Sequence, residues 1–293
     1  MGLYLDYNAT TPIDNNVLEY MVEIYTNNFG NADSRTHSYG SNAKKIVERA
    51  REQVAALLGA KRNEIIFTSG STESNNIAIL GIEQEGISKN KRHIITTAIE
   101  HKSILGPIRK LEKRGFEVDV IYPHLNGRID AGQVLDKVRE DTLLVSVMHV
   151  NNETGTIQPV EELGKQLKDK EVLFHVDASQ SCGKLVDEIQ RLQYDLLSIS
   201  AHKMYGPQGV GAIVTRMKNG KRPSIEPIMF GGGQELGLRP GTLPVALIAG
   251  FGIACDNCLK NHINYKSGCL KNLKGLLQIL SINGIKFSVK FYI

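Results

Sequence analysis

Two polar clusters that follow apolar runs contain residues able to carry out covalent and acid–base chemistry. The stretch "SISAHKMYGPQGVGA" (198–212) places Lys203 directly after His202, on a loop behind a strand-like run. Such a setting can depress the pKa of an amine and make it a nucleophile that forms Schiff bases. Lysines on loops are more often simply solvated, so Lys203 by itself does not define a site.

The stretch "VLFHVDAS" (172–179) contains Asp177 at the end of another apolar run. A buried carboxylate is costly unless a cation or an N–H group pairs with it. A protonated heterocyclic nitrogen would serve as that partner. A salt bridge to an arginine or lysine of the same domain is the alternative interpretation.

The stretch "SGSTESNN" (69–76) places Gly70, Ser71 and Thr72 where a strand gives way to a helix. Free backbone N–H groups, two hydroxyls and the positive end of the helix favour a phosphate there. An ordinary helix cap with Glu73 nearby is the alternative. The stretch is not a Walker A loop, and "GPQGVG" (206–211) lacks the strand–loop–helix setting of a dinucleotide fingerprint, which argues against an NTPase.

Together these three features match the requirements of pyridoxal phosphate. That cofactor needs an anchor for its phosphate, a partner for its pyridinium nitrogen and an amine for its aldehyde. We therefore interpret the anion site, Asp177 and Lys203 as one cofactor site.

The elements that must bring these residues together are short apolar runs rich in β-branched residues, which predict strands. The runs are 64–69, 93–97, 116–122, 143–150, 172–179, 195–200 and 209–215. Helical patterns separate most of them, and residues 41–58 show the spacing of a helix that ends at Gly59. The alternation predicts an α/β fold with a mainly parallel (mixed) sheet sandwiched by helices. Five polar loops then meet at the carboxyl edge of that sheet, where ligands bind.

Composition excludes several classes of protein. The 293 residues are 41% hydrophobic with a net charge of +4, and no basic face with interleaved aromatic residues indicates direct nucleic-acid binding. No leader pattern and no run of about 18 apolar residues appears, so we expect a cytoplasmic protein without a membrane span. Cys255 and Cys258 form a C-x-x-C within an apparent helix, without the partners of a zinc set, so we expect no metal site.

The sequence resembles the NifS/IscS-type cysteine desulfurases, which belong to the class V aminotransferases among the fold-type I pyridoxal-phosphate enzymes. The resemblance runs in order along nearly the whole chain. It is carried by "YLDYNATTP" (4–12), "FGNADSRTHSYG" (29–40), "EIIFTSGSTESNN" (64–76), "TAIEHKSIL" (97–105), "VSVMHVNNETG" (145–155), "FHVDASQSCGK" (174–184), "SISAHKMYGPQGVGA" (198–212) and "GGGQELGLRPGTLPV" (231–245).

The resemblance implies a role for each matching residue. Lys203 is the amine that links to the cofactor, and His101 stacks on its ring and can relay protons. Asp177 pairs with the ring nitrogen. The remaining cofactor-binding residues are Gln180 at the phenolic oxygen, Asn152 beside the ring, Ser71, Thr72, Ser200 and His202 at the phosphate, and Thr242, which reaches the phosphate of a neighbouring subunit in a homodimer.

The implied reaction converts L-cysteine to L-alanine and passes the sulfur to a protein thiolate as a persulfide. The acceptor would be an iron–sulfur scaffold or a tRNA-thiolation factor. In the family, the nucleophilic cysteine and a carboxylate-binding arginine lie downstream of the "GTLPV" segment, beyond Ile293. An inactive cofactor-binding scaffold and another class V reaction, such as β-elimination, therefore stay open as alternatives.

The resemblance also implies a division into domains. Residues 1–15 would contribute to a small domain, residues 16–250 would form the large cofactor-binding domain, and residues 251–293 would form a connecting helix and the beginning of the small domain. The closing "GIKFSVKFYI" (284–293) reads as a strand without its partners. A shortened product, a sequence that continues further and a separate polypeptide supplying the rest would all account for this ending.

Overall fold

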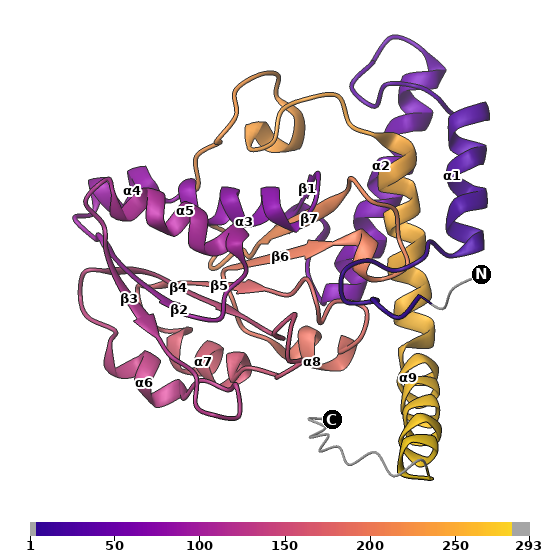
Figure 1. The fold of residues 1–293 in the computed structure, drawn as a ribbon. Helices are drawn as coiled ribbons and strands as arrows, with labels where there is room; N and C mark the ends of the chain where they lie inside the picture. The colour runs from indigo at the N-terminus through magenta and orange to yellow at the C-terminus, as the bar shows by residue number, and fades with distance from the viewer. Residues whose placement is uncertain (1–3, 283–293) are drawn as a thin grey trace.

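A seven-stranded sheet lies between two layers of helices in a computed structural model, which describes residues 4–282 and most side chains up to Ser267 (Figure 1). The strands are β1 (Ile65–Thr68), β2 (His93–Thr97), β3 (Glu117–Ile121), β4 (Thr142–Met148), β5 (Leu173–Asp177), β6 (Leu196–Ser200) and β7 (Gly211–Thr215). The α-helices are α1 (Asn15–Asn27), α2 (Ser38–Leu58), α3 (Ser71–Leu80), α4 (Glu83–Ser88), α5 (Lys102–Glu112), α6 (Ala131–Asp136), α7 (Val160–Leu167), α8 (Val186–Arg191) and α9 (Val245–Ile282). Short 3₁₀ turns are η1 (Arg62–Glu64), η2 (Ala201–Lys203) and η3 (Gln234–Gly237).

The sheet has the order β1-β7-β6-β5-β4-β2-β3. Strands β2 to β6 pair in parallel, whereas β7 runs antiparallel to both β6 and β1. An antiparallel neighbour needs no crossover helix, and only the short turn η2 interrupts the connection from β6 to β7. The predicted α/β fold with a mainly parallel, mixed sheet is confirmed.

Successive strand residues point to opposite faces of the sheet and enter separate parts of the core. Ile65 and Phe67 pack with α2 and α9, whereas Ile66 packs with Ile77 of α3 on the other face. Helices α3, α4 and α5 cover one face, and α6, α7 and α8 cover the other (Figure 1). Both faces are therefore covered, which explains the nearly continuous apolar runs.

Helix α2 confirms the helix predicted over residues 41–58 and begins three residues earlier. The His37 ring caps the first turn of α2 by accepting a hydrogen bond from the Gly40 N–H. The helix ends at Gly59, whose φ of 58° places it in the left-handed region that glycine favours. Its buried face packs along α9.

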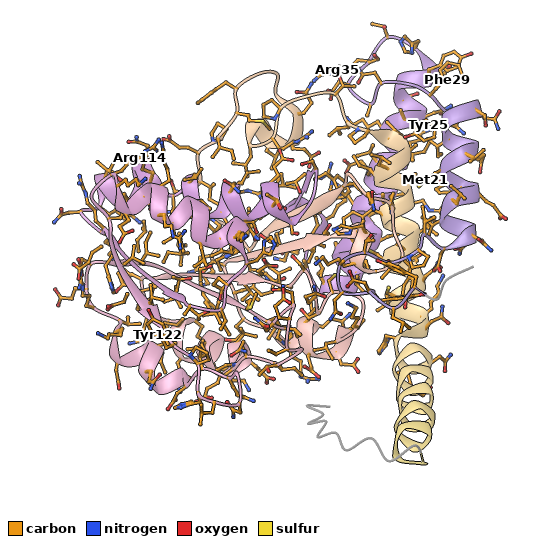
Figure 2. All side chains as sticks on the ribbon, in the orientation of Figure 1. Met21, Tyr25, Phe29, Arg35, Arg114 and Tyr122 are labelled. Atoms are coloured by element: carbon orange, nitrogen blue, oxygen red, sulfur yellow. The ribbon has the colours of Figure 1, made fainter. Side chains whose placement is uncertain are left out.

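Helix α1 packs on the opposite side of α9 through its own buried face, and Met21 lies so close to Gly250 that a side chain there would clash. Figure 2 shows side chains filling the space between sheet and helices, while Tyr25 of α1 and Phe29, which follows α1, lie on the outer surface. Within residues 4–282, no helix is long and apolar enough to cross a membrane.

The predicted division into domains stays a prediction. The closing strand predicted at 284–293 lies outside the described residues.

Candidate cofactor-binding site

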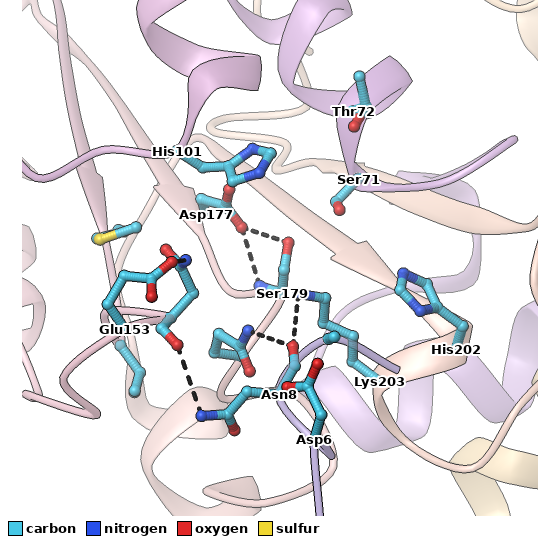
Figure 3. Close-up of a pocket in the computed structure, with 15 residues that line it drawn as sticks. Asp6, Asn8, Ser71, Thr72, His101, Glu153, Asp177, Ser179, His202 and Lys203 are labelled. Atoms are coloured by element: carbon cyan, nitrogen blue, oxygen red, sulfur yellow. Dashed lines mark hydrogen bonds between the residues drawn. The ribbon is translucent and has the colours of Figure 1, made fainter. Parts of the chain in front are cut away.

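A cavity of about 500 Å³ opens at the carboxyl edge of the sheet, and all five predicted loops contribute to it (Figure 3). The chain start adds a sixth segment. The lining residues are Asp6, Asn8, Ala9, Ser71, Thr72, His101, Met148, Val150, Asn152, Glu153, Asp177, Ser179, Gln180, His202 and Lys203. Eight of the predicted site residues thus meet in one cavity.

Asp177 ends β5 and is 6% exposed. Its Oδ1 accepts hydrogen bonds from the Ser179 N–H at 2.9 Å and from the Ser179 hydroxyl, and its Oδ2 accepts from Asn75 Nδ2 at 2.8 Å. The predicted N–H partner is therefore present. None of the ion pairs among the described residues involves Asp177. Within that part of the chain, Asp177 therefore does not form the structural salt bridge that was the alternative interpretation. The site can accept a cationic group.

Asn75 links Asp177 to His101. Its amide nitrogen also donates to Ser103 Oγ at 2.8 Å, and Ser103 contacts His101 Nδ1 through its hydroxyl at 2.8 Å and its backbone N–H at 3.1 Å. Because Nδ1 accepts from a backbone N–H, the neutral ring carries its proton on Nε2. The network thus fixes both the ring and its tautomer above the cavity.

Lys203 lies in η2, directly after β6, and its Nζ donates to the Asn8 carbonyl at 3.0 Å. Burial lowers the pKa of Lys203, and the carboxylates of Asp177, Asp6 and Glu153 offset part of this effect. The predicted depression of this pKa is confirmed. A larger share of neutral amine follows at a given pH.

A second cavity of about 350 Å³ lies at the start of α3, where Ser71, Thr72, Ser200 and His202 converge. Ser200 lines this cavity and not the larger one. Burial, followed by the positive charge of Lys203, lowers the pKa of His202, so its ring is neutral at neutral pH. Free N–H groups and hydroxyls here form a surface suited to an anion.

Close backbone packing shapes this second cavity. A side chain at Gly211 would lie 2.7 Å from the Gly70 Cα, and Gly70 itself has a φ of 150°. Both positions therefore require glycine if β7 is to approach the start of α3.

The other predicted residues take different positions. Asn152 and Gln180 line the larger cavity, and Gln180 Nε2 donates to the Asn8 carbonyl at 2.9 Å. Thr242 is exposed and lines neither cavity of its own chain. The sequence prediction missed Asn8 and Asn75, which form contacts over long sequence separations.

Glu100 is a buried acid beside this site. Its Oε1 accepts from the Thr97 hydroxyl at 2.7 Å and from the Met148 N–H at 2.8 Å, whereas its buried Oε2 has no partner. Burial, together with the nearby carboxylate of Asp177, raises the pKa of Glu100 to about 8. The side chain is therefore protonated at neutral pH and ties the loop before His101 to the end of β4.

We expect Glu100→Gln to leave stability nearly unchanged near pH 4.5 and to raise it by about 2 kcal/mol or more at pH 8. The unfolded chain releases this proton near pH 4.5, whereas the folded protein keeps it to about pH 8. The free energy of unfolding of the wild type therefore falls as the pH rises from about 4.5 to about 8, by up to about 1.4 kcal/mol per pH unit. Denaturant unfolding at both pH values measures the effect. Exposed Glu112→Gln is the control, and an equal gain at both pH values would contradict the assignment.

Cys182, Cys255 and Cys258 are free thiols within the core, each no more than 1% exposed. Burial raises the pKa of all three, and that of Cys258 to about 12. Cys182 packs within the main hydrophobic core. The side chain of Cys269 lies outside the described residues.

We expect these three thiols to resist alkylation in the folded protein at pH 8 by a factor on the order of 10² or more, because only the thiolate is nucleophilic. Peptide mass spectrometry after iodoacetamide treatment, with and without guanidinium, measures this protection. Rapid labelling of Cys182 in the folded protein would overturn it.

The sequence pattern of the family described as aminotransferase class V matches residues 3–286. A relative named cysteine desulfurase, mitosomal, from Trachipleistophora hominis is 49% identical over 257 residues, covering 87% of this chain and 58% of the relative. The crystal structure of DndA from Streptomyces lividans has a TM-score of 0.87 and 50% identity, covering 95% of this chain and 78% of that one. SspA in complex with cysteine has a TM-score of 0.80 and 41% identity, with 87% and 72% covered.

These similarities extend over the segments that form both cavities. The chain spans a little over half of the length of the mitosomal relative. The resemblance to cysteine desulfurases inferred from the sequence motifs is confirmed, as is the fold. The family pattern and the related structures both extend over the loops that form the cavity. The chain belongs to the aminotransferase class V family.

Proposed function

We propose that this chain binds pyridoxal phosphate at the carboxyl edge of its sheet and acts as a cysteine desulfurase. One observation carries the proposal: an amine with a lowered pKa, a buried carboxylate and the start of a helix surround adjoining cavities. The residues fit the cofactor because Asp177 is buried and hydrogen-bonded to neutral groups, with no cation paired to it among the described ion pairs. The protonated ring nitrogen of the cofactor would supply that cation.

Each side of the cofactor has a candidate partner. Asp177 would hold the ring nitrogen, His101 would stack on the ring, and Gln180 and Asn152 would position its oxygen and its plane. The phosphate would lie against Ser71, Thr72, Ser200 and His202, with Thr242 supplied by the other subunit of a homodimer. When bound, pyridoxal phosphate supplies an electron sink that stabilises negative charge on the α-carbon of an amino acid.

The chain's own residues control protons in this site. Partial burial increases the neutral fraction of the Lys203 amine, which is the form that attacks an aldehyde or accepts a proton. The Asn75–Ser103 network keeps the proton of His101 on Nε2 and so allows that atom to donate. Asp177 remains fixed by three hydrogen bonds while charge develops nearby.

We propose L-cysteine as the substrate, because related chains are named cysteine desulfurases and SspA is described in complex with cysteine. The sulfur–carbon bond breaks, a thiolate outside the described residues takes the sulfur as a persulfide, and the carbon skeleton leaves as L-alanine. Cys182, Cys255 and Cys258 are too buried to accept it. An iron–sulfur scaffold or a tRNA-thiolation factor is the proposed final acceptor. A cytoplasmic location stays a prediction from the sequence.

The test supplies the cofactor-loaded chain with L-cysteine and dithiothreitol, which takes the place of the acceptor thiol. We expect alanine and sulfide in equal amounts. Pyruvate and ammonia in place of alanine would indicate β-elimination and contradict the desulfurase assignment. A folded, cofactor-loaded protein that forms neither product set would contradict catalysis and favour a binding scaffold.

A further inference from the structure

The cavity at the start of α3 contains a carboxylate that does not fit an anion site. Glu73, in the first turn of α3, lines this cavity together with Ser71 and Thr72. Its side chain is 11% exposed. A negative charge so placed, and so poorly screened by water, would repel a phosphate group.

The structure also shows how that charge is balanced. Arg239 Nε donates to Glu73 Oε1 at 2.9 Å, and the Ser69 N–H donates to the other oxygen. Burial alone would raise the pKa of Glu73, yet the bonds from Arg239 and Ser69 outweigh it and lower the pKa. Glu73 is therefore ionised at neutral pH, and Arg239, itself 19% exposed, is the cation paired with it.

Arg239 comes from a distant part of the chain. It follows η3 and precedes the exposed Thr242, in the segment that lies beside α3 and β1. The other ionisable side chain that lines the cavity is His202, which is neutral at neutral pH because burial and Lys203 lower its pKa. The Glu73–Arg239 pair thus sets the balance of fixed charge along this wall.

We propose that Arg239 determines the phosphate affinity of this site by neutralising Glu73, without itself being a phosphate ligand. This inference rests on the proposed function, because it assigns the smaller cavity to the phosphate of the cofactor. Arg239 is a positioning residue in this role, since its effect passes through the carboxylate. Loss of the arginine leaves Glu73 as an unbalanced charge facing the anion.

The test is a double-mutant cycle on Arg239 and Glu73 in the cofactor-free protein. We would measure dissociation constants for pyridoxal phosphate by absorbance and for inorganic phosphate by thermal shift, in wild type, Arg239→Gln, Glu73→Gln and the double variant. We expect Arg239→Gln to bind both ligands about 10-fold more weakly. Glu73→Gln binds as tightly as wild type or several-fold more tightly, and the double variant returns to within about 3-fold of wild type.

Rescue by the second substitution separates a charge effect from a structural one. A double variant as weak as Arg239→Gln would overturn the proposal, because the arginine would then act by holding its loop or by touching phosphate. Wild-type affinity in Arg239→Gln would overturn it as well. Arg239→Lys keeps the charge and should bind within about 3-fold of wild type.

Two further readouts keep the test decisive. If Arg239→Gln does not fold by circular dichroism, Glu73→Gln alone decides: weaker phosphate binding in that variant contradicts the proposal. A folded wild-type chain that binds inorganic phosphate with the expected charge dependence, but not pyridoxal phosphate, would contradict the proposed function and leave the charge effect standing.

Discussion

Replacing Lys203 by alanine is expected to lower alanine formation from L-cysteine on the order of 10³-fold or more and to remove the covalent cofactor link. The amine is the group that would bond to the aldehyde, and its lowered pKa increases the fraction of the nucleophilic neutral form. Non-covalent contacts from Asp177 and the start of α3 stay in place, so some cofactor still binds. Initial rates of alanine release, and mass spectrometry of the borohydride-treated peptide containing position 203, measure the two effects.

Two matched variants show whether the effect belongs to this amine. Lys113→Ala removes an exposed lysine at the end of α5 and should keep wild-type rates. Lys203→Arg keeps the positive charge but not the reactive amine, and should be as inactive as Lys203→Ala. A reduced adduct on another lysine of the wild-type protein, or more than about 1% of wild-type activity in Lys203→Ala, would show that the amine has been assigned wrongly.

The part of the site that could be predicted from the sequence is the part carried by loops. Short runs rich in β-branched residues predict the strands, and the carboxyl ends of parallel strands share one edge of a sheet. The loops that follow those strands are therefore expected to meet there, and they carry Ser71, His101, Asp177 and Lys203. The order of the strands was beyond prediction, because nothing local specifies that β7 inserts between β1 and β6.

The residues that escaped prediction act through contacts without a local pattern. Asn75 is a neutral residue within a helix, and its two hydrogen bonds cross 28 and 102 positions of sequence. Asn8 contributes its backbone carbonyl to Lys203 and Gln180, and a carbonyl is present at every position of a chain. Such contacts become visible only when the fold brings distant segments together.

A buried ion pair between Arg51 and Glu235 shows the same dependence on distant contacts and leads to the largest stability effect that we predict. The guanidinium donates to both carboxylate oxygens at 2.7 and 2.8 Å, and also to the Ile65 carbonyl at 2.9 Å. Glu235 accepts in addition from the Phe67 N–H at 2.6 Å. β1 is an edge strand, so the pair satisfies backbone groups that would otherwise have no strand partner.

We expect Glu235→Ala to lower the free energy of unfolding by about 3–5 kcal/mol. The buried Arg51 guanidinium loses its two bonds to the buried carboxylate and keeps only Glu48 and the Ile65 carbonyl. The buried Phe67 N–H loses its side-chain partner. Arg51→Met should cost a similar amount. The double variant should lose at least about 2 kcal/mol less than the sum of the single losses, because no lone charge remains buried. Denaturant unfolding of the three variants at pH 7 measures this coupling.

The control for this prediction is another glutamate paired with an arginine. Glu52 lies 3.6 Å from Arg62, and its side chain is 62% exposed, so Glu52→Ala should cost less than about 1 kcal/mol. Water screens that exposed pair, whereas the low exposure of Glu235, 2% for its side chain, prevents such screening. Two results would contradict this interpretation: an equal loss of unfolding free energy in Glu52→Ala and Glu235→Ala, or strictly additive losses in the double variant. Either would mean that burial of the Arg51–Glu235 pair does not determine its contribution to stability.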